Sequence, residues 1–194
     1  MGGRQSPHRV SNALPKAFRD TPSLDKRGEG ELWFPADRRV DAIMRGVIIR
    51  RAGTADIPQM CDLLSELFSI EADFSPDRNK QARGLELLLG DASGSPAVFV
   101  AERAGEIMGM CSVQTLISTA EGGPAGLIED LIVREGHRGE GIGTRLLSEV
   151  AGWCAGKNIS RLQLLRDAGN MEALKFYNAN GWSNTKLRCM RRFL

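Results

Sequence analysis

The apolar residues in the first part of the chain recur with a helical period in two places. Between residues 54 and 68 they return every three or four positions, after Thr54 as a helix cap and Asp56 in the first turn. This spacing predicts a helix, and a second helix is expected over residues 78–89. The apolar face of the first helix consists of Ile57, Met60, Cys61, Leu64, Leu67 and Phe68.

Other segments carry the composition of strands. Residues 47–51, 97–102 and 107–117 are rich in apolar and β-branched residues. The last two flank Ala104 and Gly105, which suit a tight turn, so they predict a hairpin.

The most informative stretch is a nearly continuous apolar run at residues 127–133, followed by a glycine-rich loop at 138–144. The run predicts a buried strand. Beyond the loop, apolar residues return at helical spacing. A glycine-rich turn that opens a helix offers unpaired backbone N–H groups and the positive end of the helix dipole. We therefore expect a ligand that carries phosphate. The helical positions are Leu146, Leu147, Val150, Ala151 and Cys154.

The glycine spacing separates three kinds of phosphate loop. A Walker A loop requires a lysine after its last glycine, and no lysine follows these glycines. The dinucleotide fingerprint requires Gly-x-Gly-x-x-Gly, whereas Gly139, Gly141 and Gly143 are each two positions apart. The remaining pattern, Arg/Gln-x-x-Gly-x-Gly/Ala, is satisfied by Arg138, Gly141 and Gly143.

A second motif lies near the C-terminus. Residues 170–182 match Asn-x-x-Ala-x-x-Phe-Tyr-x-x-x-Gly-Phe, with Trp182 in place of the final phenylalanine. Asn170 suits an N-cap and Gly181 a helix stop, and residues 161–165 before them suit a strand. The two motifs together resemble those of the GCN5-related N-acetyltransferase (GNAT) family. The resemblance runs from about residue 47 to the C-terminus.

The resemblance implies an α/β (α+β) fold with a mixed, mostly antiparallel sheet of about six to seven strands, flanked by helices. Its fourth and fifth strands splay apart. The expected order is strand, two helices, three strands, helix, strand, helix, strand. The domain is predicted over residues 46–194. Residues 1–45, rich in Gly, Pro, Ser and charge, predict a poorly ordered extension, and Met44 offers an alternative start that would make them an overextension.

The resemblance also implies a cosubstrate, acetyl-CoA, and an activity, acetyl transfer to a primary amine by direct attack in a ternary complex. The backbone at the end of the strand would pair with the pantetheine arm, and the loop amides would hold the pyrophosphate. Tyr177 falls where the family often has the acid that protonates the coenzyme sulfur, since a phenol is protonated at neutral pH. The residues expected to bind the cofactor are Leu131, Ile132, Val133, Arg138, Gly139, Glu140, Gly141, Ile142, Gly143, Thr144, Asn170, Ala173 and Tyr177.

Two adjacent carboxylates interrupt the apolar strand. Strand alternation sends the side chains of Glu129 and Asp130 to opposite faces of the sheet. A carboxylate in such an apolar strand is costly unless it contacts water, has a hydrogen-bond or ionic partner, or serves a function. In similar small-molecule acetyltransferases this acidic strand faces the acceptor. Glu129 is therefore expected to bind or deprotonate the amine, with Asp130 as a further substrate residue or a structural hydrogen-bond acceptor.

The acceptor itself is not specified by the sequence. In the family, specificity resides in segments that correspond to residues 68–83 and 118–124 here. The first contains Glu71, Asp73 and Asp77, which would either attract a cationic amine or form a solvated acidic loop.

Composition narrows the class of partner. The net charge of +2 gives no warrant for a nucleic-acid partner, and no stretch approaches the ~20 apolar residues that span a bilayer. Four separated cysteines suit reduced thiols in the cytoplasm, and two histidines without a close cysteine pair argue against a metal site.

We therefore expect a small-molecule amine as acceptor. A protein or aminoacyl-tRNA acceptor, a non-catalytic acetyl-CoA or CoA sensor, and a homodimer stay open.

Overall fold

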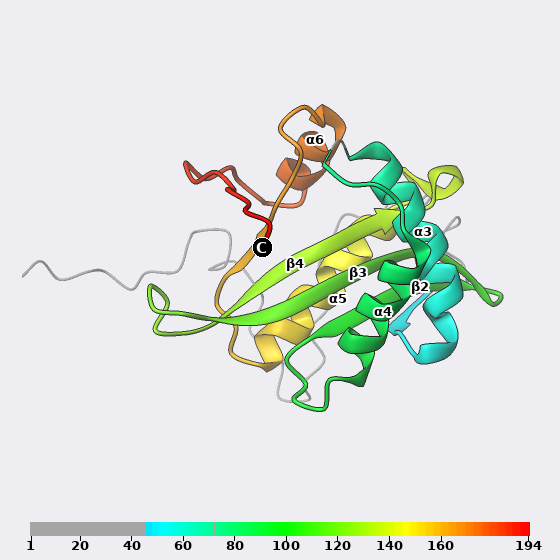
Figure 1. The fold of residues 1–194 in the computed structure, drawn as a ribbon, viewed down its shortest axis with the longest axis horizontal. Helices are drawn as coiled ribbons and strands as arrows, with labels where there is room; N and C mark the ends of the chain where they lie inside the picture. Colours follow the sequence, from blue (N-terminus) through cyan, green and yellow to red (C-terminus); the bar gives the residue numbers. More distant parts are fainter. Residues whose placement is uncertain (1–45, 72) are drawn as a thin grey trace, which may run out of the picture. The chain divides into compact units, whose positions relative to one another are not determined.

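The computed structural model describes residues 46–71 and 73–194, so the predicted N-terminal extension lies outside the described residues. The elements follow the expected order up to the last helix (Figure 1). They are β1 (Ile48–Arg51), η1 (Thr54–Asp56), α3 (Ile57–Ile70), α4 (Arg78–Gly90), β2 (Ala97–Arg103), β3 (Glu106–Ser118), β4 (Gly123–Val133), η2 (Glu135–His137), α5 (Ile142–Gly156), β5 (Leu162–Leu164) and α6 (Met171–Ala179).

One mixed sheet organises the described part of the chain, with the strand order β1-β2-β3-β4-β5. The first four strands are antiparallel to their neighbours, and β5 is parallel to β4. Only Gly126, Leu127 and Ile128 of β4 pair with β5, which ends at Leu164, so β4 has no partner on that side from Glu129 to Val133. The expected mixed sheet is confirmed, and the pairing of β4 with β5 ends at Ile128, directly before the two carboxylates.

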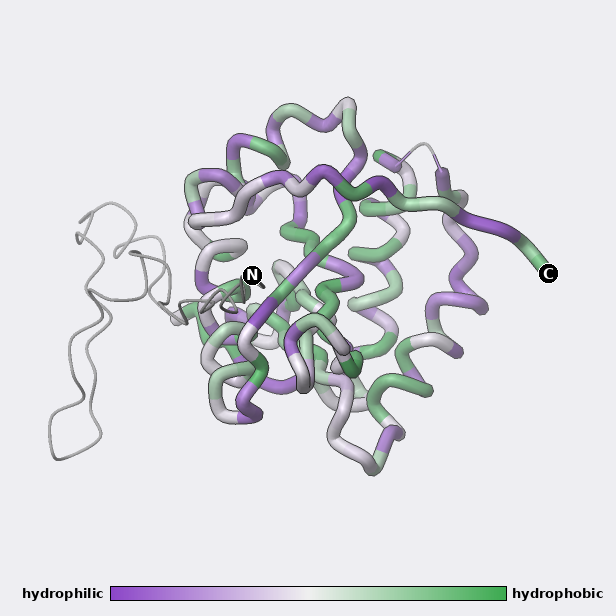
Figure 2. The backbone as a smooth tube through the Cα atoms, turned by 90° about the vertical axis from the view of Figure 1, so that its left-hand side faces the viewer, coloured by the Kyte–Doolittle hydropathy of each residue, from purple (hydrophilic) through white to green (hydrophobic). Residues whose placement is uncertain are grey.

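Helices cover both faces of this sheet. One apolar cluster joins α5 to β2 through Phe99 and Ala101, and the other joins α3 and α4 to β2 through Val98 and Val100. Successive residues of β2 thus enter opposite cores, as the period of a strand requires. In Figure 2 hydrophobic and hydrophilic residues alternate along the helices, as expected for elements buried on one side.

The number of strands is lower than predicted. The described residues form a sheet of five strands, not six or seven, and no strand follows α6. The side chains of Leu187, Met190 and Phe193 are exposed. Cations at Arg188, Arg191 and Arg192 interrupt the alternation, so pairing this segment with the sheet would bury little apolar surface.

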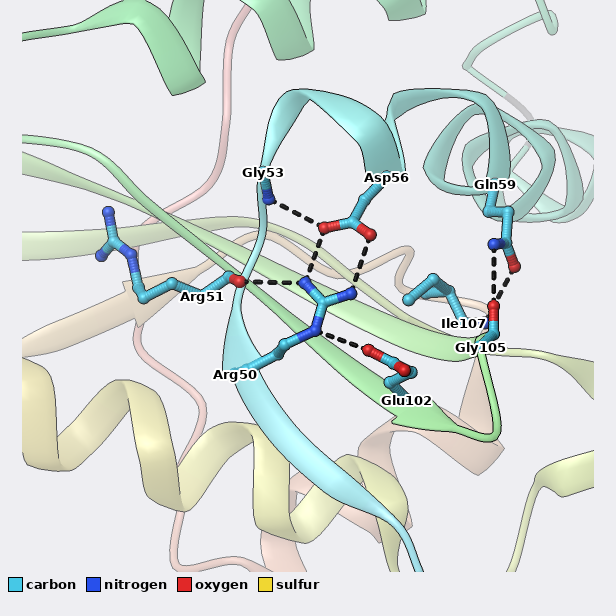
Figure 3. A network of polar contacts seen from close by, with 8 residues as sticks. All are labelled: Arg50, Arg51, Gly53, Asp56, Gln59, Glu102, Gly105 and Ile107. Atoms are coloured by element: carbon cyan, nitrogen blue, oxygen red, sulfur yellow. Dashed lines mark hydrogen bonds and ion pairs between the residues drawn. The ribbon is translucent and has the colours of Figure 1, made fainter.

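A polar network fixes the first strand to the helical layer (Figure 3). The guanidinium of Arg50 donates to both carboxylate oxygens of Asp56 at 2.7 and 2.8 Å, and its Nε donates to Glu102 at 2.6 Å. Asp56 also accepts from the backbone N–H of Gly53 at 2.8 Å. Because Arg50 holds the pKa of Asp56 below its usual value, the network carries opposite charges at neutral pH.

Candidate active site

Two cavities flank the end of β4, which pairs with β3 but has no partner on the side of β5. The first, of about 900 Å³, lies between the end of β4, the loop at 138–144 and α6, and we refer to it as the loop cavity. The second, of about 760 Å³, lies against α3, α4 and β4, with two residues of the C-terminal segment at its edge, and we refer to it as the helix cavity. Glu129 lines both cavities. The acidic end of β4 is therefore where the two cavities adjoin.

The glycines of the loop are required for different structural reasons. Gly139 and Gly141 have φ of 81° and 85°, in the left-handed region that a side chain disfavours. Gly141 is the N-cap of α5 and supplies no side-chain hydrogen bond to the helix. The first amides of α5 thus keep their capacity to bind an anion at the loop cavity.

Gly143 serves packing as well. A Cβ at this position would lie 3.0 Å from Cζ of Phe176, closer than ordinary carbon contacts. Gly143 therefore lets the ring of Phe176, on α6, rest directly against the first turn of α5.

Every residue predicted to bind the cofactor lines the loop cavity except Glu140. The Glu140 carboxylate turns to His137, with Oε1 3.2 Å from Nδ1 of the ring. Glu140 is the single acidic residue of the loop at 138–144, and it does not line the cavity; the acidic residues of the lining lie outside the loop and are Glu71, Glu129, Asp167 and Glu172. Arg138 is exposed at the cavity, and its Nε donates to the backbone oxygen of Val133 at 3.0 Å.

The second motif forms α6 as expected. The side chain of Asn170 caps the helix by accepting from the N–H of Ala173 at 2.9 Å. Tyr177 packs edge-on against Phe176 and Trp182, with ring centroids 5.3 and 5.9 Å apart. Burial raises the pKa of Tyr177 to about 12, and nearby Cys111 and Glu71 add to the rise. The phenol in the loop cavity therefore stays protonated at physiological pH.

A bulge decides how the two carboxylates lie. Cys111 pairs with Leu131 and Val113 with Ile128, so Ser112 alone faces Glu129 and Asp130 together. Uninterrupted alternation would send the two side chains to opposite faces. Both instead line the helix cavity, because the extra residue shifts the register.

The environments of the two carboxylates differ. Asp130 is half-buried and accepts from Oγ of Ser112 at 2.6 Å. Burial raises its pKa to about 6, the hydrogen bond from Ser112 opposes the rise, and the charge of Glu129 adds to it. Glu129 is exposed. Asp130 is thus tied to β3, while Glu129 is free to meet a ligand from either cavity.

Of three further polar residues around this site, Ser112 and Gln81 were not predicted to belong to it, and Glu71 was expected only as part of an acidic segment that attracts a cationic amine or is solvated. Ser112 is fully buried and holds Asp130, and a lone serine in a strand gives no sequence signal for that task. Glu71, at the end of α3, has a pKa raised by burial and by the charges of Asp130, Asp167 and Asp73. Gln81 of α4 is buried and lines the helix cavity.

Within residues 46–71 and 73–194, no cluster of three or more His, Cys, Asp or Glu side chains is arranged to hold a metal ion. No helix in this part of the chain is long and apolar enough to cross a membrane.

Solved structures with this fold include several acetyltransferases. An aminoglycoside acetyltransferase from an uncultured soil metagenomic sample, in complex with sisomicin, is 22% identical with a TM-score of 0.65, over 78% of this chain and 99% of that chain. An aminoglycoside N-acetyltransferase in complex with CoA is 18% identical with a TM-score of 0.66, over 76% and 94%. Glucosamine-6-phosphate N-acetyltransferase from Arabidopsis thaliana is 23% identical with a TM-score of 0.62, over 76% and 98%.

The sequence comparison gives the family. A search of curated proteins found no match. The model of the acetyltransferase (GNAT) family matches residues 57–182, which is more than half of the chain and includes both motifs. The chain therefore belongs to the acetyltransferase (GNAT) family and is an acyltransferase of a family that uses acetyl-CoA.

Proposed function

We propose that the protein transfers the acetyl group of acetyl-CoA to a primary amine of a small molecule, by direct attack within a ternary complex. The observation that carries the proposal is that Glu129 lines both the loop cavity and the helix cavity. A donor in the first and an amine in the second would meet at this carboxylate, as a reaction without an acyl-enzyme requires.

The loop cavity fits the donor. Phosphate oxygens would accept from the first amides of α5 and from the loop at 138–144, where Gly139 and Gly141 remove steric hindrance. Arg138 would add positive charge at the edge. The end of β4 from Leu131 to Val133 has no partner on the side of β5, and on that side its backbone groups would pair with the amide-containing arm in the manner of an added strand. Acetyl-CoA, when bound, supplies the acetyl group as a thioester.

Glu129 would handle the proton of the amine. An amine must be neutral to attack, and an exposed carboxylate can accept its proton directly or through a water molecule. Asp130 is held by Ser112 and would position the strand and add negative charge beside Glu129. Glu129 would take the proton that makes the amine neutral, the nitrogen would bond to the acetyl carbon as the carbon–sulfur bond breaks, and the proton that the nitrogen loses as the amide forms would balance the protonation of the departing thiolate.

Tyr177 would serve the departing sulfur. Its pKa of about 12 keeps the O–H in place to donate to the thiolate. A phenol of this pKa is a weaker acid than a thiol, whose ordinary pKa is about 8.5. Tyr177 would therefore contribute mostly by a hydrogen bond that stabilises the departing thiolate before any proton is transferred.

The comparisons support a small-molecule acceptor, because the named relatives act on aminoglycosides and glucosamine-6-phosphate. A protein or aminoacyl-tRNA acceptor and a non-catalytic sensor would share the loop cavity. They differ in what they require of Glu129 and Tyr177, since a sensor needs neither.

The test is thiol release from acetyl-CoA against a panel of small amines, with the acetylated product identified by mass spectrometry. We expect turnover on at least one amine and its loss in Glu129→Gln, with binding of acetyl-CoA kept. Glu149→Gln, an exposed carboxylate of α5 that lines neither cavity, is the control. Tight binding without turnover on any amine would contradict the proposal and favour the sensor or a macromolecular acceptor.

A further inference from the structure

The helix cavity has an excess of negative charge. Of its acidic residues, Asp77 accepts from the backbone N–H groups of Asn79 and Lys80, each at 3.1 Å, and Asp91 accepts from that of Ser93 at 2.7 Å. These two carboxylates serve the ends of α4. The other three carboxylates of the lining, Asp73, Glu129 and Asp130, do not cap α4. The lining carries five carboxylates, Asp73, Asp77, Asp91, Glu129 and Asp130, against two cations, Lys80 and Arg191.

One wall of this cavity already receives a cation. The guanidinium of Arg191 lies 4.7 Å from the ring centroid of Phe74, which in turn packs against Phe68 with centroids 5.3 Å apart. Aromatic faces attract cations through their quadrupole. The aromatic wall and the carboxylates thus favour the same kind of ligand, a positively charged one.

Gln81 gives an independent indication of a ligand. Its side chain lines the cavity, the residue is only 6% exposed, and Nε2 is buried without a hydrogen-bond partner. Oε1 lies 3.2 Å from Oγ of Ser65, but the single proton of that hydroxyl is directed to the oxygen of Cys61 at 2.8 Å. Rotating the amide by half a turn lets Nε2 donate to Ser65 and leaves Oε1 without a partner. A buried amide oxygen then needs a donor, which an ammonium group supplies.

Resting on the proposed function, we propose that the helix cavity selects an acceptor with at least two ammonium groups. One nitrogen is presented to Glu129 for acetylation. The other is held by the remaining polar groups of the cavity, chiefly the amide oxygen of Gln81 and the carboxylate of Asp73. The second charge fixes the orientation of the first nitrogen. Acceptors with an anionic group in that place are repelled, which separates diamines from amino acids and phosphorylated amino sugars.

Three probes of equal chain length isolate the second charge. The probes 1,4-diaminobutane, n-butylamine and 4-aminobutyrate share one primary amine and end in a cation, a neutral group and an anion. Each is titrated by calorimetry into the full chain with and without saturating CoA. The titration without CoA measures the cavity independently of donor binding. We expect the diamine to bind at least about tenfold more tightly than n-butylamine, and 4-aminobutyrate to bind most weakly.

Substitutions of opposite sign separate charge recognition from structural damage. Asp73→Asn and Gln81→Met are expected to weaken diamine binding about tenfold each, because each loses one hydrogen bond to a charged group. Arg191→Gln is expected to tighten it, because a competing cation is removed from the cavity. Glu86→Gln, on an exposed part of α4 outside the lining, is expected to change nothing.

The proposal is overturned if the diamine binds no better than n-butylamine, if 4-aminobutyrate binds best, if no probe binds, or if Arg191→Gln weakens the diamine as Asp73→Asn does. The proposed function fails by a different result, the absence of binding or turnover of acetyl-CoA. A protein that binds and uses acetyl-CoA but acetylates monoamines as well as diamines would keep the function and lose this inference.

Discussion

Because Gly143 packs against Phe176, replacing Gly143 by alanine should destabilise the protein. The same replacement at Gly152 of the same helix should stabilise it. A Cβ at Gly143 would meet Cζ and Cε2 of the ring at 3.0 and 3.2 Å, whereas a Cβ at Gly152 would meet nothing within 4 Å. Both residues belong to α5. Gly143→Ala and Gly152→Ala therefore make the same chemical change in the same helix, with and without a facing aromatic ring.

The expected magnitudes follow from two opposing effects. Alanine in place of glycine stabilises a helix interior by about 0.5–1 kcal/mol, and Gly152→Ala should show this gain. At Gly143 the ring must withdraw by about half an ångström to reach an ordinary carbon contact. Overpacking of this kind costs about 1–3 kcal/mol, so Gly143→Ala should be less stable than the natural protein by about 0.5–2 kcal/mol.

Urea unfolding followed by circular dichroism measures both variants against the natural protein. A second readout is the dissociation constant of acetyl-CoA. It should rise in Gly143→Ala, because Phe176 carries α6 and Tyr177 with it, and stay unchanged in Gly152→Ala. The reasoning would be refuted if Gly143→Ala were as stable as Gly152→Ala, since α6 would then not rest against α5 at this glycine.

Three further substitutions test the site and the network of Figure 3. Tyr177→Phe should lower kcat about 100-fold with little change in acetyl-CoA affinity, and the rate of the natural enzyme should show no loss assignable to Tyr177 below about pH 11, since its pKa is about 12; an unchanged kcat would remove Tyr177 from the chemistry. Asp130 has an ordinary pKa of 3.8 and a folded pKa of about 6, so the folded chain keeps a proton that the unfolded chain loses between these values. Relative to Asp130→Asn, the free energy of unfolding of the natural protein should therefore fall as the pH rises through this window, by about 2–3 kcal/mol in all, and parallel stability curves would contradict the burial of this carboxyl. Asp56→Asn should cost about 1.5–3 kcal/mol in urea unfolding at pH 7, because it loses charge-assisted bonds to Arg50. That cost should shrink as the pH falls below 3.8, because the unfolded chain then takes up a proton that the folded carboxyl, whose pKa Arg50 lowers, does not yet bind; a cost independent of pH would point to packing instead.

Periodicity and turn chemistry were sufficient to predict the order of elements through α6. Each of those elements has a local cause, such as the cap at Asn170 or the left-handed turn at Gly141. The strand expected after α6 is absent from the described residues because it depended on family order alone. Local sequence gives that segment no buried face, as the exposed Leu187 and Met190 illustrate.

The candidate site was also predicted only in part from the sequence. The motif located the residues of the loop cavity, but it did not reveal that Glu140 turns to His137, since that depends on a side-chain partner three residues away. The bulge at Glu129 and Asp130 was hidden because register depends on the facing strand, where Ser112 stands alone.

Gln81 is a different case. It lies four positions before Leu85, on the same face of α4 as the buried leucine, so the sequence did carry a signal for a buried amide.

The most direct test of the account is calorimetric titration of acetyl-CoA into the natural protein, Gly141→Glu and Gly152→Glu. The glutamate at position 141 stands at the N-cap of α5, in a left-handed conformation and beside the amides assigned to the pyrophosphate, whereas position 152 is exposed and lines neither cavity. We predict micromolar binding to the natural protein and to Gly152→Glu, and none to a folded Gly141→Glu. Absence of binding to the natural protein, or equal binding to Gly141→Glu, would contradict the assignment of the loop cavity to the donor.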